Sequence, residues 1–199
     1  DAGEGEEPPT DATPAVVVLE GNYHGTNMIP QYLRGQWGRY VRNLEVVTVE
    51  PNDPAGLEAA FEARPGRIAA FWAEPVLMNR EAIPVDVPYL RLARELCDRE
   101  GAVMCIDEIQ TGFWQPDVFA FHAAGIVPDM VIAGKGMTAG VHPLAAVLCR
   151  NCFDVLDQYD AINTNGSAPL AAMAALCVLE IIRQSRDAIA SIGDLYFDS

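Results

Sequence analysis

Six short runs of mostly β-branched and small apolar residues recur along the chain and set the strongest limit on its fold. Several of them are apolar without alternating with polar residues, which is typical of strands covered on both faces. The runs lie at residues 16–19, 44–49, 68–72, 103–106, 130–133 and 145–148. Strands of this kind need helices on each side of the sheet.

Segments with helical signals lie between and after these runs. Residues 54–63 follow Asp53, a candidate N-cap, and residues 88–99 start with Pro and stop at Gly101. A third helix is predicted from residue 169 to about residue 183, and its apolar residues predict a mostly buried surface. These residues are Leu170, Met173, Ala174, Cys177, Val178 and Ile181. The alternation of strands and helices predicts an α/β fold with a mostly parallel, mixed sheet flanked by helices.

Composition divides the chain into three parts. Residues 1–14 are acidic and rich in Pro and Gly, which predicts a flexible tail or a surface insertion because such a segment buries too little apolar surface to order itself. Residues 15–185 hold all the apolar runs and are expected to form one domain. Residues 186–199 are expected to begin a further C-terminal segment.

The charge of the chain excludes two classes of partner. A net charge of −15 repels nucleic-acid phosphates and anionic lipid, and we expect neither nucleic acid nor a membrane as partner. No apolar run approaches the roughly 20 residues of a spanning helix, and the first residues lack the features of a signal peptide. We therefore expect a cytoplasmic protein.

The five cysteines are an odd number and lie mostly within apolar runs, as small buried residues do, which fits a reducing compartment. Cys149 and Cys152 form a C-x-x-C, but no second pair or nearby His completes a zinc site, so no metal is predicted.

Two motifs place polar groups directly after apolar runs. They are I-D-E-I-Q-T-G-F at residues 106–113 and V-P-D-M-V-I-A-G-K-G at residues 127–136. Ligands of open α/β sheets bind beyond the carboxyl ends of the strands, so Asp107 and Lys135 are expected to face one crevice. A lysine that forms an imine and a carboxylate that keeps a pyridine nitrogen protonated are what an aldehyde cofactor of the pyridoxal type needs.

Two other interpretations of these motifs are simpler. Asp107 and Lys135 could form a salt bridge at a sheet edge, with Gly134 and Gly136 as turn residues. A phosphate-binding P-loop requires Gly where Asp129 stands and Ser or Thr where Gly136 stands, so that interpretation fails.

The order and spacing of several motifs resemble the class III aminotransferases, which depend on pyridoxal 5'-phosphate. The resemblance rests on N-Y-H-G (residues 22–25), E-P-V (74–76), D-E-I-Q-T-G-F, V-P-D, G-K-G, P-L-A-A-V and N-T-N-G-S-A-P-L-A (163–171). It covers residues 15–183, most of the chain. It implies the large domain of fold type I and an enzyme that moves an amino group from an amino acid or amine to a keto acid or aldehyde.

The resemblance also implies roles for residues of the two central motifs. Lys135 would form the Schiff base with the cofactor and then move the proton between substrate and cofactor. Asp107 would hold the pyridinium, Gln110 would bind the ring's phenolic oxygen, and Ile109 would pack on one ring face.

Four further residues receive cofactor-binding roles from the same resemblance. Tyr23 would stack on the other ring face, with His24 beside it, and Glu74 would orient the groups behind the ring. Thr164 would bind the cofactor phosphate of a neighbouring subunit, which implies a homodimer. Other roles stay open: Tyr23 and Ile109 as core residues, His24 as a structural hydrogen-bonding residue, and Thr164 as a helix cap.

The sequence departs from the family at two positions near the expected substrate pocket. Many family members continue E-P-[VI] with Q-G-E, whereas this chain has Asn79 in place of that Glu. Asn cannot form the ion pair that this Glu makes with an arginine. An Asn at this position resembles the branch of glutamate-1-semialdehyde aminomutases and β-amino acid transaminases. The family's G-R-T-G is also replaced, which would put Trp114 near the site.

Segments expected of the family are missing from the chain, namely an upstream phosphate-binding loop and a downstream small domain. We therefore expect a partial chain that retains the cofactor weakly or not at all by itself. Two alternatives to the aminotransferase stay open: a 2,1-aminomutase, and a non-catalytic fragment that serves as a dimerisation or binding module.

Overall fold

The structure is a computed structural model that describes residues 13–158, 160 and 168–197. The chain divides into two compact units, Asp1–Cys105 and Ile106–Ser199, and the boundary falls inside strand β6. None of the helices in the described part of the chain is long and apolar enough to cross a membrane.

The first unit is built around parallel strands. Its elements are β1 (Ala15–Leu19), α1 (Met28–Leu33), β2 (Glu45–Val49), α2 (Pro54–Glu62), β3 (Ile68–Ala73), β4 (Val76–Leu77), β5 (Ile83–Pro84), α3 (Val87–Glu100) and the first residues of β6 (Val103–Asp107). Hydrogen bonds order the strands β2-β1-β3-β6, and β1 is parallel to both β2 and β3. The short strands β4 and β5 form a separate antiparallel pair.

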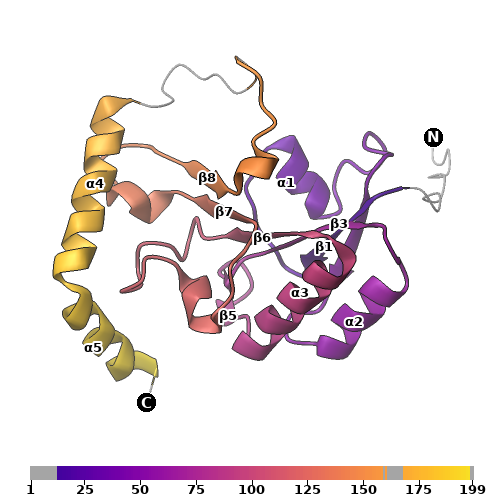
Figure 1. The fold of residues 1–199 in the computed structure, drawn as a ribbon, viewed down its shortest axis with the longest axis horizontal. Helices are drawn as coiled ribbons and strands as arrows, with labels where there is room; N and C mark the ends of the chain where they lie inside the picture. The colour runs from indigo at the N-terminus through magenta and orange to yellow at the C-terminus, as the bar shows by residue number, and fades with distance from the viewer. Residues whose placement is uncertain (1–12, 159, 161–167, 198–199) are drawn as a thin grey trace. The chain divides into compact units, whose positions relative to one another are not determined.

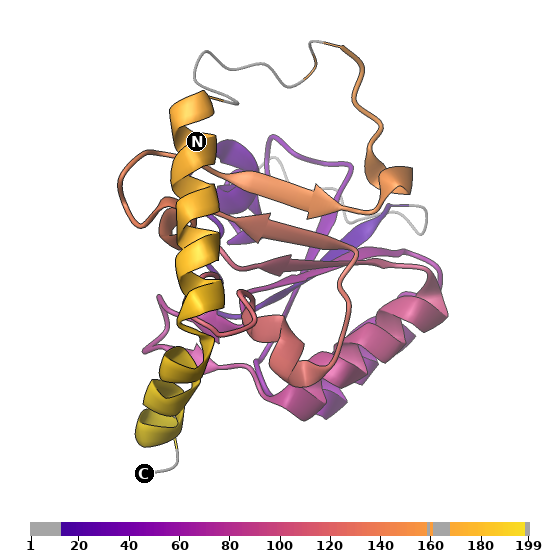
Figure 2. The same cartoon turned by 60° about the vertical axis from the view of Figure 1, so that its left-hand side comes forward.

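Strand β1 is the centre of this unit, and all of its residues are buried. Val16 and Val18 pack with Leu33 of α1, so Val17 points to the opposite face of the sheet. Figures 1 and 2 show α1 on one side of these strands and α2 and α3, which contact each other, on the other side. Layers of helix on both faces explain why the strand is apolar throughout.

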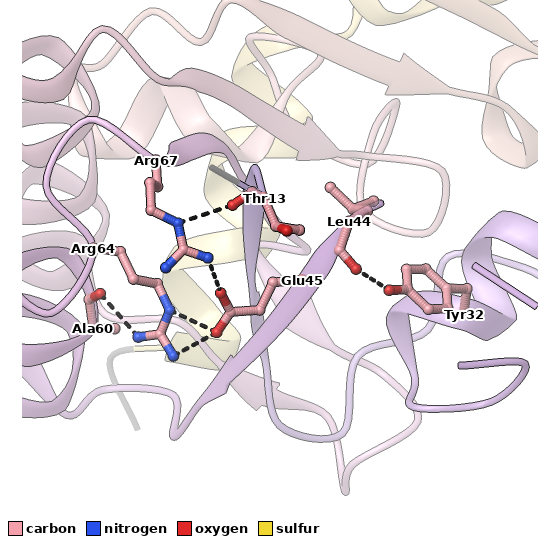
Figure 3. Close-up of polar contacts among 7 residues, drawn as sticks. All are labelled: Thr13, Tyr32, Leu44, Glu45, Ala60, Arg64 and Arg67. Atoms are coloured by element: carbon pink, nitrogen blue, oxygen red, sulfur yellow. Dashed lines mark hydrogen bonds and ion pairs between the residues drawn. The ribbon is translucent and has the colours of Figure 1, made fainter. Parts of the chain in front are cut away.

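An ionic cluster fixes the start of β2 (Figure 3). One carboxylate oxygen of Glu45 accepts a hydrogen bond from Arg64 Nε at 2.8 Å, and the other accepts one from Arg67 Nη2 at 2.6 Å. Arg67 Nε also donates to the carbonyl of Thr13 at 2.9 Å. The hydrogen bond from Arg64 holds the pKa of Glu45 below its usual value against the opposing effect of burial, and both arginine charges add to the lowering.

The second unit continues from β6. Its further elements are η1 (Ala120–Ala124), β7 (Met130–Ala133), η2 (Lys135–Thr138), β8 (Ala146–Cys149), η3 (Asn151–Phe153), α4 (Pro169–Gln184) and α5 (Arg186–Phe197). The strand order is β6-β7-β8, with β8 antiparallel to β7. Helix α4 contacts η2, and in Figure 2 α5 continues from its lower end.

The predicted strands and helices are confirmed, with ends that differ by at most one residue, and the predicted mixed, mostly parallel sheet is confirmed as well. Three short 3-10 helices, α1, α5 and the β4–β5 pair were not predicted. The prediction of a mostly buried apolar stripe on α4 is wrong, because Leu170, Met173 and Ile181 are 60%, 62% and 60% exposed. The helix instead buries Ala171, Ala175 and Ile182, and two of these are small enough to let the backbone approach its neighbours closely.

The expectation that the cysteines are mostly buried is also wrong. Cys97 and Cys105 are buried, whereas Cys149, Cys152 and Cys177 are exposed. The reason lies in the elements that carry them, since β8, η3 and the outer side of α4 are largely uncovered in this chain.

Candidate active site

Two neighbouring strands of the second unit end side by side at the candidate site. Asp107 is the last residue of β6, and Lys135 follows β7 after a single glycine. The backbone N–H of Glu108, directly after β6, donates to the carbonyl of Ile132 in β7 at 2.8 Å. Asp107 and Lys135 therefore leave the two strands at the same end, which is where α/β sheets bind ligands.

Gly136, next to Lys135, allows this segment to approach the D-E-I-Q-T-G-F motif closely. A Cβ on Gly136 would lie 3.0 Å from the carbonyl oxygen of Gly112, whereas a Cβ on Gly134 would make an ordinary contact at 3.6 Å from Ile109 Cγ1. Lys135 itself is exposed and is the single lysine of the chain. Its φ of 39° is in the left-handed region, which costs a residue other than glycine about 1–3 kcal/mol.

Asp107 is a buried carboxylate with a fixed orientation. Its side chain is 4% exposed, and Oδ1 accepts a hydrogen bond from the backbone N–H of Ile109 at 3.0 Å. Ile109 and Gln110 are half-buried. The backbone turn after β6 thus keeps Asp107 and the next two residues in a defined arrangement.

Glu108 was not predicted as part of the site, but it connects the motif to the rest of the unit. The side chain is fully buried, and its carboxylate accepts hydrogen bonds from the Thr111 hydroxyl and, at 2.9 Å, from the Phe121 N–H. Burial raises the pKa of Glu108 above its usual value. The sequence holds no signal for this role, because Phe121 lies thirteen residues away on η1.

The first unit carries the remaining predicted cofactor-binding residues that the structure describes. The backbone N–H of Tyr23 donates to Glu74 Oε2 at 2.7 Å, and Glu74 is 2% exposed. His24 is buried, and its ring lies 4.9 Å from that of Trp72. The Arg34 guanidinium lies 5.5 Å from the centre of the Tyr23 ring, a contact that the sequence did not predict.

The predicted substrate-pocket residues are both exposed. Asn79 lies in the turn between β4 and β5. Trp114 is 70% exposed, and its Nε1 lies 3.5 Å from the position of a Cβ on Gly136, next to Lys135. Thr164 lies outside the described residues. Among the residues that the structure describes, no group of His, Cys, Asp and Glu side chains could hold a metal ion.

A lysine and a buried carboxylate at neighbouring strand ends of an α/β sheet are the arrangement expected of enzymes that hold an aldehyde cofactor on a lysine. The family profile described as Aminotransferase class-III matches residues 43–194. The chain belongs to this family of pyridoxal-phosphate-dependent aminotransferases, as its motifs predicted.

Individual relatives agree with this assignment. The chain is 35% identical over 185 residues to an ornithine aminotransferase of Emericella nidulans, and 37% identical over 163 residues to a glutamate-1-semialdehyde 2,1-aminomutase of Opitutus terrae. These alignments cover 85% and 73% of the chain, but only 40% and 38% of the relatives.

A solved structure of a family member shows the same fold. It is the ornithine aminotransferase of Toxoplasma gondii, described as showing partial occupancy of PLP at the protein active site. The TM-score is 0.75 at 27% identity, over 91% of this chain and 43% of that one. The chain therefore spans less than half the length of these relatives.

Proposed function

We propose that the protein containing this chain is a pyridoxal-phosphate-dependent aminotransferase that moves an amino group from an amino acid or amine to a keto acid or aldehyde. The observation that carries the proposal is the placement of Asp107 and Lys135 at the same end of β6 and β7. When bound, pyridoxal phosphate supplies an aldehyde that reacts with primary amines and a ring that takes up electrons.

Lys135 has the properties that this chemistry requires of the chain. Its amine is exposed and can reach a bound molecule, while Gly136 lets the backbone lie close to the neighbouring motif. We assign Nζ two tasks: to bind the cofactor covalently in the resting enzyme, and to move the proton at the substrate Cα during turnover.

Asp107 fits the charged nitrogen of the cofactor ring. A carboxylate that is 4% exposed interacts more strongly with a pyridinium than one in water, because the surroundings are less polar. The hydrogen bond from Ile109 N–H fixes its direction. In this proposal Gln110 donates to the phenolic oxygen, and Ile109 packs against the ring.

The family resemblance also assigns cofactor contacts to residues of the first unit. Tyr23 would stack on the ring, and the bond between its backbone N–H and Glu74 supports this by fixing the backbone of Tyr23. We keep the predicted cofactor role of His24 and the orienting role of Glu74. Three points stay predictions: the binding of the cofactor phosphate by Thr164, a homodimer that shares the site between subunits, and a cytoplasmic location.

A second candidate is the aminomutase reaction, in which the amino group moves within one molecule. Two observations favour it: Asn79 stands where many aminotransferases have Glu, and the relative in Opitutus terrae is named a glutamate-1-semialdehyde 2,1-aminomutase. Trp114, exposed beside Gly136, would help to shape the substrate pocket in either reaction. Conversion of glutamate-1-semialdehyde without any keto-acid acceptor would select this candidate.

Amino transfer by the full-length protein, measured with a panel of amines and keto acids, tests the proposal. We expect Asp107→Asn to lower kcat by at least about a hundredfold, because an amide cannot hold the ring nitrogen protonated. Asp117→Asn is the matched control, since Asp117 is exposed and pairs with Arg186, and it should retain activity. Equal activities of the two variants would contradict the assigned role of Asp107.

A further inference from the structure

A small polar pocket lies in the first unit at the C-terminal ends of β1 and β2. Its volume is about 180 Å³, and its polar lining residues are Glu20, Asn22, Arg34 and Thr48. Glu20 and Asn22 follow β1, Thr48 belongs to β2, and Arg34 caps the end of α1. None of these residues has a role in the amino-transfer site proposed above.

The pocket offers one positive and one negative charge. Within the described part of the chain, the Arg34 guanidinium forms no ion pair, and its contact is the face of the Tyr23 ring. The Glu20 carboxylate likewise has no ion pair or hydrogen-bond partner among the described residues, although the Glu20 carbonyl accepts a bond from Arg80. Both charged groups are thus available to a ligand.

Asn22 adds a buried acceptor to the pocket. Its side chain is 3% exposed, and Nδ2 donates to the carbonyl of Leu19 at 2.9 Å, which fixes the orientation of the amide. Oδ1 then has no hydrogen-bond partner among the described residues. A buried polar atom in this state costs about 1–3 kcal/mol, and an N–H group of a ligand would satisfy it.

We propose that this pocket binds a small free α-amino acid as its zwitterion. The ammonium group interacts with the Glu20 carboxylate and donates to Asn22 Oδ1, while the carboxylate binds the Arg34 guanidinium and accepts from the Thr48 hydroxyl. A volume of about 180 Å³ suits a small amino acid. The position at the carboxyl ends of parallel strands is the usual place for ligands of an α/β sheet.

Calorimetric titration of the full-length protein tests this proposal with 2-methylalanine as the probe. This amino acid has no hydrogen on Cα and cannot undergo amino transfer by loss of a Cα proton. Isobutyrate and isopropylamine are matched probes that carry only the carboxylate or only the ammonium group. We expect a dissociation constant in the millimolar range or below for 2-methylalanine, and binding at least about tenfold weaker for each single-charge probe.

Three variants test whether 2-methylalanine binds in this pocket. Arg34→Gln and Glu20→Gln should each weaken binding of 2-methylalanine by about tenfold or more. Arg39→Gln is the control, because Arg39 stands over the Tyr40 ring in the same segment and lies outside the pocket, and it should bind as the wild type does. Unchanged binding in the first two variants, an equal loss in all three, or no binding by the wild type would overturn the proposal.

The same titration in a Lys135→Arg background separates this pocket from the amino-transfer site. Binding with unchanged affinity is the expected result, since Lys135 takes no part in the pocket. Loss of binding in that background would show that the probe occupies the amino-transfer site, and the proposal would be wrong. If the pocket does not bind an amino acid, the proposed aminotransferase function is unaffected, because it rests on Lys135 and Asp107.

Discussion

Replacing Glu108 tests whether its buried carboxylate holds the motif that carries Asp107 and Gln110. Glu108→Leu leaves the Thr111 hydroxyl and the Phe121 N–H without their acceptor. Each buried donor without a partner costs about 1–3 kcal/mol, so the two together predict a loss of about 2–6 kcal/mol in the free energy of unfolding. Glu108→Gln is the control, because its amide oxygen can accept from Phe121 N–H while its NH₂ group donates to the Thr111 hydroxyl, which limits the loss to about 1 kcal/mol.

Urea denaturation of the full-length protein, together with hydrogen exchange at the Phe121 amide, measures both effects. Glu108→Leu should expose the Phe121 amide to exchange, and Glu108→Gln should protect it. Burial raises the pKa of Glu108 in the folded protein. The free energy of unfolding of the wild type, relative to that of Glu108→Gln, is therefore greatest below the unfolded pKa of about 4.5 and falls as pH rises through the folded pKa. Equal stability and equal exchange in the Leu and Gln variants would refute the assigned role of Glu108.

Three further predictions concern stability and can be checked by urea denaturation. Arg64 and Arg67 lower the pKa of Glu45, so the stability from these two ion pairs is present above about pH 4.5 and lost as pH falls through the folded pKa. Glu45→Gln should therefore cost about 1–3 kcal/mol in the free energy of unfolding at pH 7. A difference in stability between this variant and the wild type that persists in acid would contradict this prediction. Ile182→Ala should cost about 2–5 kcal/mol, whereas Ile181→Ala, at an exposed position of the same helix, should change stability by less than about 0.5 kcal/mol. Gly112→Ala should cost about 1–3 kcal/mol, because the new Cβ would lie 2.8 Å from the carbonyl oxygen of Glu108; full stability would show that the turn adjusts freely.

Local sequence patterns predict the strands of this chain well, because burial on both faces leaves a continuous apolar run. Helix α1 was missed since it has six residues and contains Pro30, which gives no helical period to detect. For α4 the pattern identified the apolar residues but not the side that the chain covers. That side depends on which neighbour the helix meets, as the buried Ala171 and Ala175 show.

The candidate site was predictable where it depends on strand ends. Asp107 and Lys135 each follow an apolar run, so the sequence alone placed them at the same edge of the sheet. Contacts between distant segments gave no such signal. The bonds of Glu108 to η1 and of Tyr23 to Glu74, and the position of Arg34 over Tyr23, depend on tertiary structure that no local period encodes.

Covalent capture of the cofactor shows directly whether Lys135 is the residue that binds it. The full-length protein is mixed with pyridoxal phosphate, reduced with borohydride, digested and mapped by mass spectrometry. Because Lys135 is the single lysine among residues 1–199, any labelled side chain in this part of the protein is identified without ambiguity. We predict visible imine absorbance before reduction and the label on the peptide that contains Lys135. A label on a lysine elsewhere in the protein, or no label at all, would contradict the role of Lys135.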